Sequence, residues 1–401
     1  MLRSRKFLLV YIGQLFSLLA DNVYLIALPW LVLQATGSTL ALGSVFALAA
    51  IPRVLLLPFG GVLADRAGQR RIMLTVSFFR GLVLLGLAAL LAGGDIWALY
   101  PAALLLGAAT AFYYPAEGSI IPRVVTDEQL APANSLVHGT TQLLGIIGPG
   151  LGGVIVGILG GEVALLVAAA SYGLASTVLF FLHLKIPEVG ERPSFFKQLS
   201  EGVYTVWRDP TLRWLILVIA FSNLGFTGPF FVGIPALVHN VFGLGAEAFG
   251  TLAAAFSMGS LLGVSLAALM SRFEAKGKLV VVAALLTNVA LGFLGVVPQF
   301  VYGLGLLLIA GVGSGILNVL LITLIQLRTP KALLGRVMSL ILVGSFGLSP
   351  LSQFLAGAFA ERFSVILLFP LGASISIIAL LFGSRWIIKL QAGAKNAPSV
   401  S

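Results

Sequence analysis

The sequence predicts an all-α integral membrane protein with twelve transmembrane helices arranged as two six-helix bundles. Hydrophobic residues make up 59% of the 401-residue chain and charged residues only 9%, whereas a soluble domain carries roughly a quarter charged residues. The mean hydropathy is +1.07. Because so few charges cannot cover a surface that faces water, lipid must cover most of it.

Apolar runs of transmembrane length recur along the whole chain. A membrane helix needs about 20 largely apolar residues. Such runs predict helices over residues 7–34, 39–64, 72–92, 96–115, 133–160, 163–184, 213–240, 247–271, 278–297, 300–327, 334–360 and 364–388. The first run is too long for the apolar core of a signal peptide and lacks a small-residue cleavage site, so we interpret it as the first membrane helix.

The positions of the basic residues predict the orientation. If both termini are cytoplasmic, every Lys and Arg falls on the cytoplasmic side except Arg53, Arg80 and Arg362. This asymmetry follows the positive-inside rule and requires an even number of helices. The net charge of +10 is therefore explained by short clusters between apolar runs. These clusters form no basic face, so we expect no nucleic-acid partner.

The longest hydrophilic stretch divides the chain into an N-terminal bundle (1–184), a cytoplasmic linker (185–212) and a C-terminal bundle (213–401) with a short cytoplasmic tail. Within the linker, residues 194–207 can form an amphipathic surface helix. The two halves resemble each other weakly: Gly37 through Arg66 matches Gly245 through Arg272. A parallel six-plus-six repeat is typical of transporters whose substrate site lies between the halves near the membrane midplane.

A short motif follows the second predicted helix. The stretch from Gly60 to Arg71 reads GGVLADRAGQRR. We expect its aspartate to accept backbone hydrogen bonds at a helix end, its glycines to permit close helix packing and a tight turn, and its arginines to hold the loop at the cytoplasmic surface. These residues, with a glutamate that we expect to form a gate salt bridge with them, make the predicted cytoplasmic gate: Gly61, Asp65, Arg66, Gly68, Arg70, Arg71 and Glu117.

This loop resembles the signature G-x-L-a-D-r-x-G-r-k of the major facilitator superfamily. Its second-half copy has Ser271 in place of the aspartate. The fifth helix resembles the superfamily's antiporter motif, G-P-x-x-G-G, through Gly148, Pro149, Gly152 and Gly153. There the proline removes a backbone donor and kinks the helix, while the glycines give a flat packing face.

The whole chain is similar to one branch of that superfamily, which includes macrolide-efflux proteins and enterobactin-type siderophore exporters. The resemblance rests on Asp21 through Trp30, on the loop signature, on Pro122 through Ser135 and on Gly335 through Met338. It implies export and a multi-pass protein of the bacterial inner membrane. It does not fix the cargo, because such proteins carry different molecules.

Asp21 lies about 20 Å along the first helix. A charge at that depth costs about 2.5–3.5 kcal/mol on insertion scales, so it should face protein or water. Arg53 in the second helix lies at a similar depth. Two interpretations stay open: a structural Asp21–Arg53 pair, or a carboxylate that takes up and releases a proton. We expect Arg80 to reach the cytoplasmic surface by snorkelling.

Polar and aromatic side chains inside the membrane helices are the candidates for a substrate cavity. The resemblance implies that helices one, four, seven and ten line it. Aromatic surface with a few amides suits a large amphipathic molecule. The candidates, with one residue from helix five, are Gln14, Asn22, Tyr113, Tyr114, Gln142, Asn223, Phe226 and Asn318.

These observations predict a secondary transporter that exports amphipathic small molecules by alternating access, coupled to protons by antiport. The same fold also serves lysophospholipid flippases, which is the alternative. An intramembrane enzyme or a non-transporting sensor is disfavoured, because no catalytic cluster and no Walker-type sequence is visible. The chain has no cysteine and no metal-ligand spacing, so we expect no metal and no cofactor. We also expect the protein to be a monomer in the bilayer.

Overall fold

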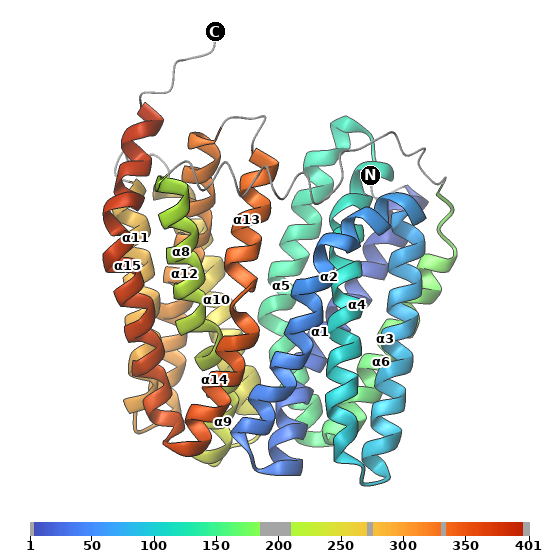
Figure 1. The fold of residues 1–401 in the computed structure, drawn as a ribbon. Coiled ribbons are helices and arrows are strands. Elements are labelled where there is room, and N and C mark those ends of the chain that lie inside the picture. The colour runs from blue at the N-terminus through green and yellow to red at the C-terminus, as the bar shows by residue number, and fades with distance from the viewer. Residues whose placement is uncertain (1–3, 185–209, 271–275, 330–333, 396–401) are drawn as a thin grey trace. The chain divides into compact units, whose positions relative to one another are not determined.

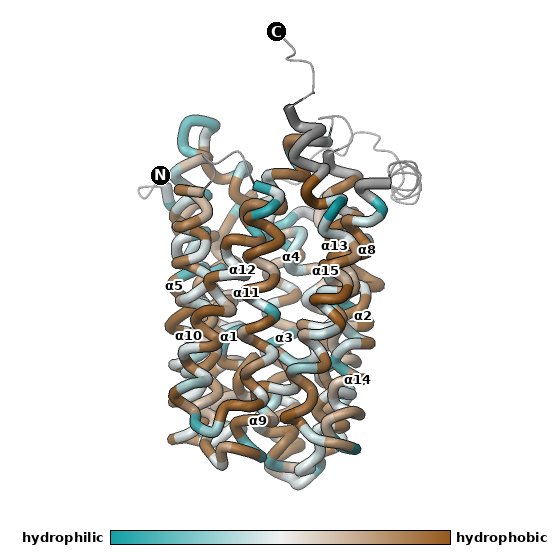
Figure 2. The backbone as a smooth tube through the Cα atoms, turned by 90° about the vertical axis from the view of Figure 1, so that its left-hand side faces the viewer, coloured by the Kyte–Doolittle hydropathy of each residue, from teal (hydrophilic) through white to brown (hydrophobic). Residues whose placement is uncertain are grey.

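The computed structural model is all-helical over the residues that it describes, which are 4–184, 210–270, 276–329 and 334–395 (Figure 1). Twelve of its helical segments are long and apolar enough to cross a membrane. The prediction of twelve membrane helices is thereby confirmed. Figure 2 shows hydrophobic residues recurring along the whole length of these helices. The linker residues 185–209, and the amphipathic helix expected there, lie outside the described residues.

Two compact units divide the chain: unit 1 comprises 1–192 and 243–254, and unit 2 comprises 193–242 and 255–401. The helices of the first half are α1 (Arg5–Thr36), α2 (Thr39–Ala67), α3 (Gln69–Ala92), η1 (Ile96–Ala98), α4 (Leu99–Ile120), η2 (Ile121–Arg123), α5 (Asp127–Leu159) and α6 (Gly161–Phe180). The helix α10 (Ala246–Met270) begins in unit 1 and continues in unit 2.

The second half contains α8 (Pro210–Gly228), the π-helical turn η3 (Pro229–Gly233), α9 (Ile234–Asn240), α11 (Lys276–Phe293), η4 (Leu294–Val296), α12 (Phe300–Arg328), α13 (Leu334–Phe346), α14 (Ser349–Arg362) and α15 (Val365–Lys395). Two of the membrane spans are interrupted helices. One runs from α8 through η3 to α9, and the other joins α13 to α14.

The predicted helix ends differ most at the last span, which was predicted to end at 388 whereas α15 continues to Lys395, and around the fourth and fifth spans. The sequence predicted an end at Pro115 and a new start at 133. In the structure α4 continues to Ile120 and α5 begins at Asp127. Pro115 lies inside α4, and the hydroxyl of Ser119 donates to its carbonyl oxygen at 2.8 Å. Because proline has no N–H, it leaves the carbonyl of Ala111, four residues earlier, without its helical hydrogen bond. Membrane helices tolerate such a loss where neighbouring groups satisfy the freed carbonyl.

Small residues hold the helices of unit 1 close together. A side chain at Gly60 of α2 would collide with the carbonyl oxygen of Ala111 on α4, and one at Gly107 of α4 would collide with Ala49. Large hydrophobic side chains remain on the outside, among them Ile158, which is 76% exposed. An exterior that is apolar in this way is stable only against lipid.

One end of unit 1 gathers the basic residues. An apolar cluster there joins Phe7 of α1, Ala64 of α2, Ile120 of α4 and Leu179 of α6. The same end therefore carries the beginnings of α1 and α3, and the ends of α2, α4 and α6. Its cationic side chains are those of Arg5, Lys6, Arg66, Arg70, Arg71 and Arg123.

Candidate functional site

The carboxylate of Asp21 joins three helices in the middle of unit 1. Its Oδ1 accepts a hydrogen bond from the phenol of Tyr172 on α6 at 2.6 Å. The same oxygen lies 3.5 Å from a guanidinium nitrogen of Arg80 on α3. The side chain of Asp21 is 31% exposed, whereas that of Arg80 is only 1% exposed. The carboxylate is therefore paired on one side and open on the other.

The guanidinium of Arg80 is enclosed by polar and aromatic groups. It donates to the hydroxyl of Thr110 on α4 at 2.6 Å, and that hydroxyl in turn donates to the carbonyl of Leu106. Its carbon lies 4.9 Å from the ring centroid of Tyr113 and 5.4 Å from that of Tyr172. Cation–π contacts strengthen when they are desolvated. Together with the ion pair, they offset the cost of burying this charge.

Close packing of α3 against α6 brings Arg80 and Tyr172 together. Gly81 follows Arg80 directly, and a Cβ built there would lie 3.3 Å from the carbonyl oxygen of Ala169 and 3.6 Å from the Cβ of Tyr172. The hydroxyls of Ser17 and Ser77 lie 3.4 Å apart and are buried between α1 and α3. Small residues of this kind allow membrane helices to approach each other.

The ion pair differs from the predicted one. Asp21 pairs with Arg80 on α3, not with Arg53 on α2, which is half-buried and has other interactions. The prediction that Arg80 reaches the membrane surface is wrong, because its side chain is fully enclosed. Depth along a helix can be counted from sequence. The direction in which a side chain points depends on how the helices are rotated and packed, which the count does not give.

Two buried polar atoms near this pair have no partner among the described residues. They are the phenol oxygen of Tyr24 and the Nε of Arg80. Buried polar groups are normally hydrogen-bonded, and leaving one unpaired costs about 1–3 kcal/mol. The cluster therefore has unused hydrogen-bonding capacity beside a carboxylate that is partly open.

The other cavity candidates are placed differently in the two units. In unit 1, Gln14 and Asn22 are buried, Gln142 is half-buried and Tyr114 is 48% exposed. In unit 2, the amide of Asn223 donates to the carbonyl of Ile219, Phe226 stacks on Phe230 with centroids 5.3 Å apart, and Asn318 is exposed. Tyr113, by contrast, lies at the Asp21–Arg80 pair, because its ring centroid is 4.9 Å from the guanidinium carbon of Arg80.

The loop between α2 and α3 turns at Gly68, whose φ of +86° favours glycine. Arg70 donates to the carbonyl oxygens of Leu179 and Phe180 at 3.2 and 2.6 Å, and so caps the end of α6. The close approach expected at Gly61 is instead made by the preceding Gly60, since nothing lies within 4 Å of a Cβ built at Gly61.

The predicted gate salt bridge to Glu117 is not found among the described residues. Its side chain is half-buried in α4, and none of the described arginines lies within 4 Å of it. The side chain of Asp65 lies outside the described part of the chain, as do residues 271–275, which contain its second-half counterpart Ser271.

The glycines of α5 form two contact faces. A side chain at Gly148 or Gly152 would collide with Asn22 or press on Val23 of α1. A side chain at Gly153 would come within 3 Å of the backbone of Ala246, where α10 begins in unit 1. The carbonyl of Pro149 packs in the same way against Gly250 of α10. This segment thus allows α5 to lie against α1 and the start of α10 at once.

The sequence profile of the Major Facilitator Superfamily matches residues 10–350. The multidrug efflux pump Tap of Mycolicibacterium fortuitum is 27% identical over 88% of this chain and 89% of its own length. The enterobactin exporter EntS of Escherichia coli is 27% identical over 82% of this chain and 79% of its own length.

Solved structures agree with this fold. A mutant form of the nucleoside transporter NupG superposes with a TM-score of 0.76 at 13% identity, covering 95% of this chain and 99% of NupG. A bacterial homologue of the iron transporter ferroportin, in the inward-facing state, superposes with a TM-score of 0.70 at 17% identity. The match covers 98% of this chain and 99% of the homologue. At such identities the likeness establishes the fold and not the cargo.

Proposed function

The chain belongs to the major facilitator superfamily, and from that premise we propose that it exports amphipathic small molecules of the drug, macrolide or siderophore type by alternating access and proton antiport. Membership makes it a multi-pass membrane transporter and not an enzyme, and its relatives include a drug efflux pump and an enterobactin exporter. The cargo class, the coupling ion and the transport cycle are our proposal.

The Asp21–Arg80–Tyr172 cluster is the observation that carries this proposal. A carboxylate that is paired on one side and open on the other can exchange its partner. When Asp21 takes up a proton, it loses its charge attraction to Arg80, and the phenol of Tyr172 then faces a neutral carboxyl. In a medium of low dielectric, that change of one charge is large enough to bias the packing of α1 against α3 and α6.

The basic end of unit 1 supports an orientation with this end in the cytoplasm. Among the described residues, the opposite end has acidic Asp95 just before η1 and Glu162 in the first turn of α6. By the positive-inside rule, we propose that the N-terminus lies inside. With an even number of spans the C-terminus lies on the same side, and we propose the bacterial inner membrane as the location.

The test is transport by purified protein in proteoliposomes, with and without a pH gradient. The panel contains macrolides, catecholate siderophores and cationic dyes. We expect an acidic lumen to drive uptake into the proteoliposomes for at least one class. Asp21→Asn should abolish gradient-driven accumulation while leaving downhill exchange of the same cargo. The matched control is Asp127→Asn, an exposed carboxylate at the start of α5. If Asp21→Asn accumulates cargo with normal pH dependence, the coupling role of Asp21 is wrong.

A groove in unit 2 favours a second candidate, transport of lysophospholipids. It has a volume of about 410 Å³ between α8, α14 and α15, and its walls are apolar apart from Ser352 and Arg362. An acyl chain suits such walls, and an arginine suits a phosphate. Fluorescent lysolipid is therefore a further arm of the same assay, and its transport in place of the other cargoes would establish this alternative.

A further inference from the structure

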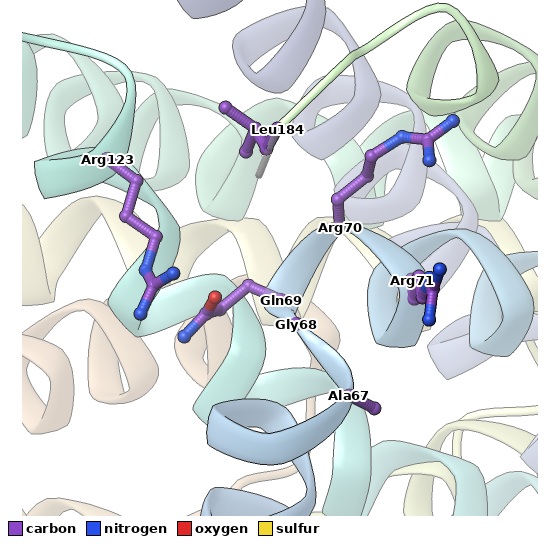
Figure 3. A pocket seen from close by; sticks show the side chains of 7 residues that line it. All are labelled: Ala67, Gly68, Gln69, Arg70, Arg71, Arg123 and Leu184. Atoms are coloured by element: carbon purple, nitrogen blue, oxygen red, sulfur yellow. The ribbon is translucent and has the colours of Figure 1, made fainter. Parts of the chain in front are cut away.

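A small pocket lies at the basic end of unit 1, where α2 turns into α3. It is lined by residues from the turn, from η2 after α4 and from the segment after α6, which are Ala67, Gly68, Gln69, Arg70, Arg71, Arg123 and Leu184 (Figure 3). Its volume is about 80 Å³. Drug-sized ligands occupy about 300–1,000 Å³, so this pocket is too small for the proposed cargo.

Its polar walls consist of cations and amides, with no carboxylate among the lining residues. Arg71 and Arg123 are exposed, and neither has a described acidic side chain within 4 Å. Arg70 is already used by the carbonyls of α6. Figure 3 shows the amide of Gln69 next to the guanidinium of Arg123, with Arg70 and Arg71 on the other side of the turn. An amide N–H and a guanidinium both donate hydrogen bonds, so the two groups together suit an anion.

Gln69 gives the independent indication of a ligand. Its side chain is only 2% exposed, yet its Nε2 has no hydrogen-bond partner among the described residues. A buried N–H without an acceptor costs about 1–3 kcal/mol. Because this amide lines the pocket, an acceptor oxygen placed there would satisfy it.

The beginning of α3 favours an anion in the same place. Its N-cap is Gly68, which has no side chain to accept the first backbone N–H groups, and its first turn has no acidic residue. That turn instead carries Arg70 and Arg71, which are the wrong sign for the positive end of a helix dipole. A bound anion would reverse this unfavourable arrangement, as phosphates do at other helix N-termini.

We propose that this pocket binds a phosphate group, held by the Gln69 amide, the guanidinium group of Arg123 and the first N–H groups of α3, with Arg71 adding positive charge nearby. Arginine suits phosphate because its planar fork donates two hydrogen bonds at once. Two sources share this chemistry: the headgroup of an anionic phospholipid and free inorganic phosphate. Apolar Leu184 and Ala67 beside the cations suit a headgroup with an acyl chain attached.

The experiment measures binding to the full-length protein in a detergent without phosphate, at about 0.15 M salt. Short-chain phosphatidic acid and inorganic phosphate are titrated separately, and affinity is followed by native mass spectrometry and calorimetry. We expect Arg123→Gln to weaken phosphatidic acid binding by about tenfold or more, as loss of a charge-assisted hydrogen bond implies. The control is Arg5→Gln, an exposed arginine at the same end that does not line the pocket.

A second variant tests the pocket by placing a negative charge inside it. Gln69→Glu places a carboxylate of nearly the same shape among the arginines. It should abolish phosphate binding and raise the melting temperature of the ligand-free protein, because the variant supplies its own anion. This readout does not depend on transport.

The outcomes separate the sources. Tight binding of phosphatidic acid with weak binding of inorganic phosphate assigns the site to a lipid headgroup, and the reverse assigns it to the free ion. If both ligands bind Arg123→Gln and Arg5→Gln equally, or if neither binds the native protein, the proposal is wrong. A lower melting temperature for Gln69→Glu than for the native protein would also overturn it.

Discussion

The first helix of each half has a different character at its middle. In unit 1, α1 carries Asp21, which is bound to Arg80 and Tyr172. In unit 2, α8 and η3 carry Phe226 and Phe230, which pack against Phe256 of α10 with centroids 6.1 and 4.7 Å away. One unit therefore places a buried charge where the other places aromatic surface.

This difference indicates a division of labour between two related bundles. A buried ion pair is a weak source of stability, because desolvation cancels most of its Coulomb energy. We therefore propose a switching role for the pair in unit 1. Aromatic rings give large apolar area with little conformational entropy to lose, which suits binding of varied cargo. We therefore expect mutations in unit 1 to alter coupling and those in unit 2 to alter affinity.

Removal of the Arg80 cation should have the largest effect. Arg80→Gln leaves Asp21 as a half-buried charge without its partner, and breaking a buried pair costs about 3–5 kcal/mol. We expect a large loss of thermal stability in detergent and no gradient-driven transport. The double variant with Asp21→Asn should recover much of the stability without recovering coupling. A double variant as unstable as Arg80→Gln alone would show that the cation acts through other contacts.

Removal of the Tyr172 hydroxyl should have an intermediate effect on stability and coupling. Tyr172→Phe removes the 2.6 Å hydrogen bond to Asp21 and keeps the ring under Arg80. Hydrogen bonds to charged groups are worth about 1.5–3 kcal/mol. We expect lower stability and a shifted pH profile of transport. Tyr24→Phe is the matched control, because the Tyr24 hydroxyl is buried with no hydrogen-bond partner among the described residues. Its loss should leave stability unchanged or slightly higher. Equal profiles for the two variants would contradict the assigned role of Tyr172.

The sequence predicted the twelve spans well, because apolar length alone determines them. It also singled out Asp21 as a charge deep in a membrane helix, since an acid in an apolar run stands out. It could not identify the partner. Arg53 and Arg80 both lie within membrane helices, and only the packing of α3 against α6 determines which one reaches α1. Tyr172 was missed, although a single tyrosine among the alanines of α6 was a signal that could have found it.

A substitution in the aromatic cluster of unit 2 should have the smallest effect, and it should change the KM for cargo instead of the coupling to protons. Phe230→Leu keeps apolar volume but removes ring packing with Phe226 and Phe256, which is worth about 0.5–1.5 kcal/mol. We expect aromatic cargo to lose a ring contact of the same strength, which at 1.4 kcal/mol per tenfold raises its KM by about two- to tenfold. The dependence of transport on the pH gradient should not change. Phe221→Leu is the control, because that ring is 46% exposed on the same membrane span and lies outside the cluster. A change in pH dependence without a change in KM would place coupling in unit 2 as well, and the division of labour between the two units would be lost.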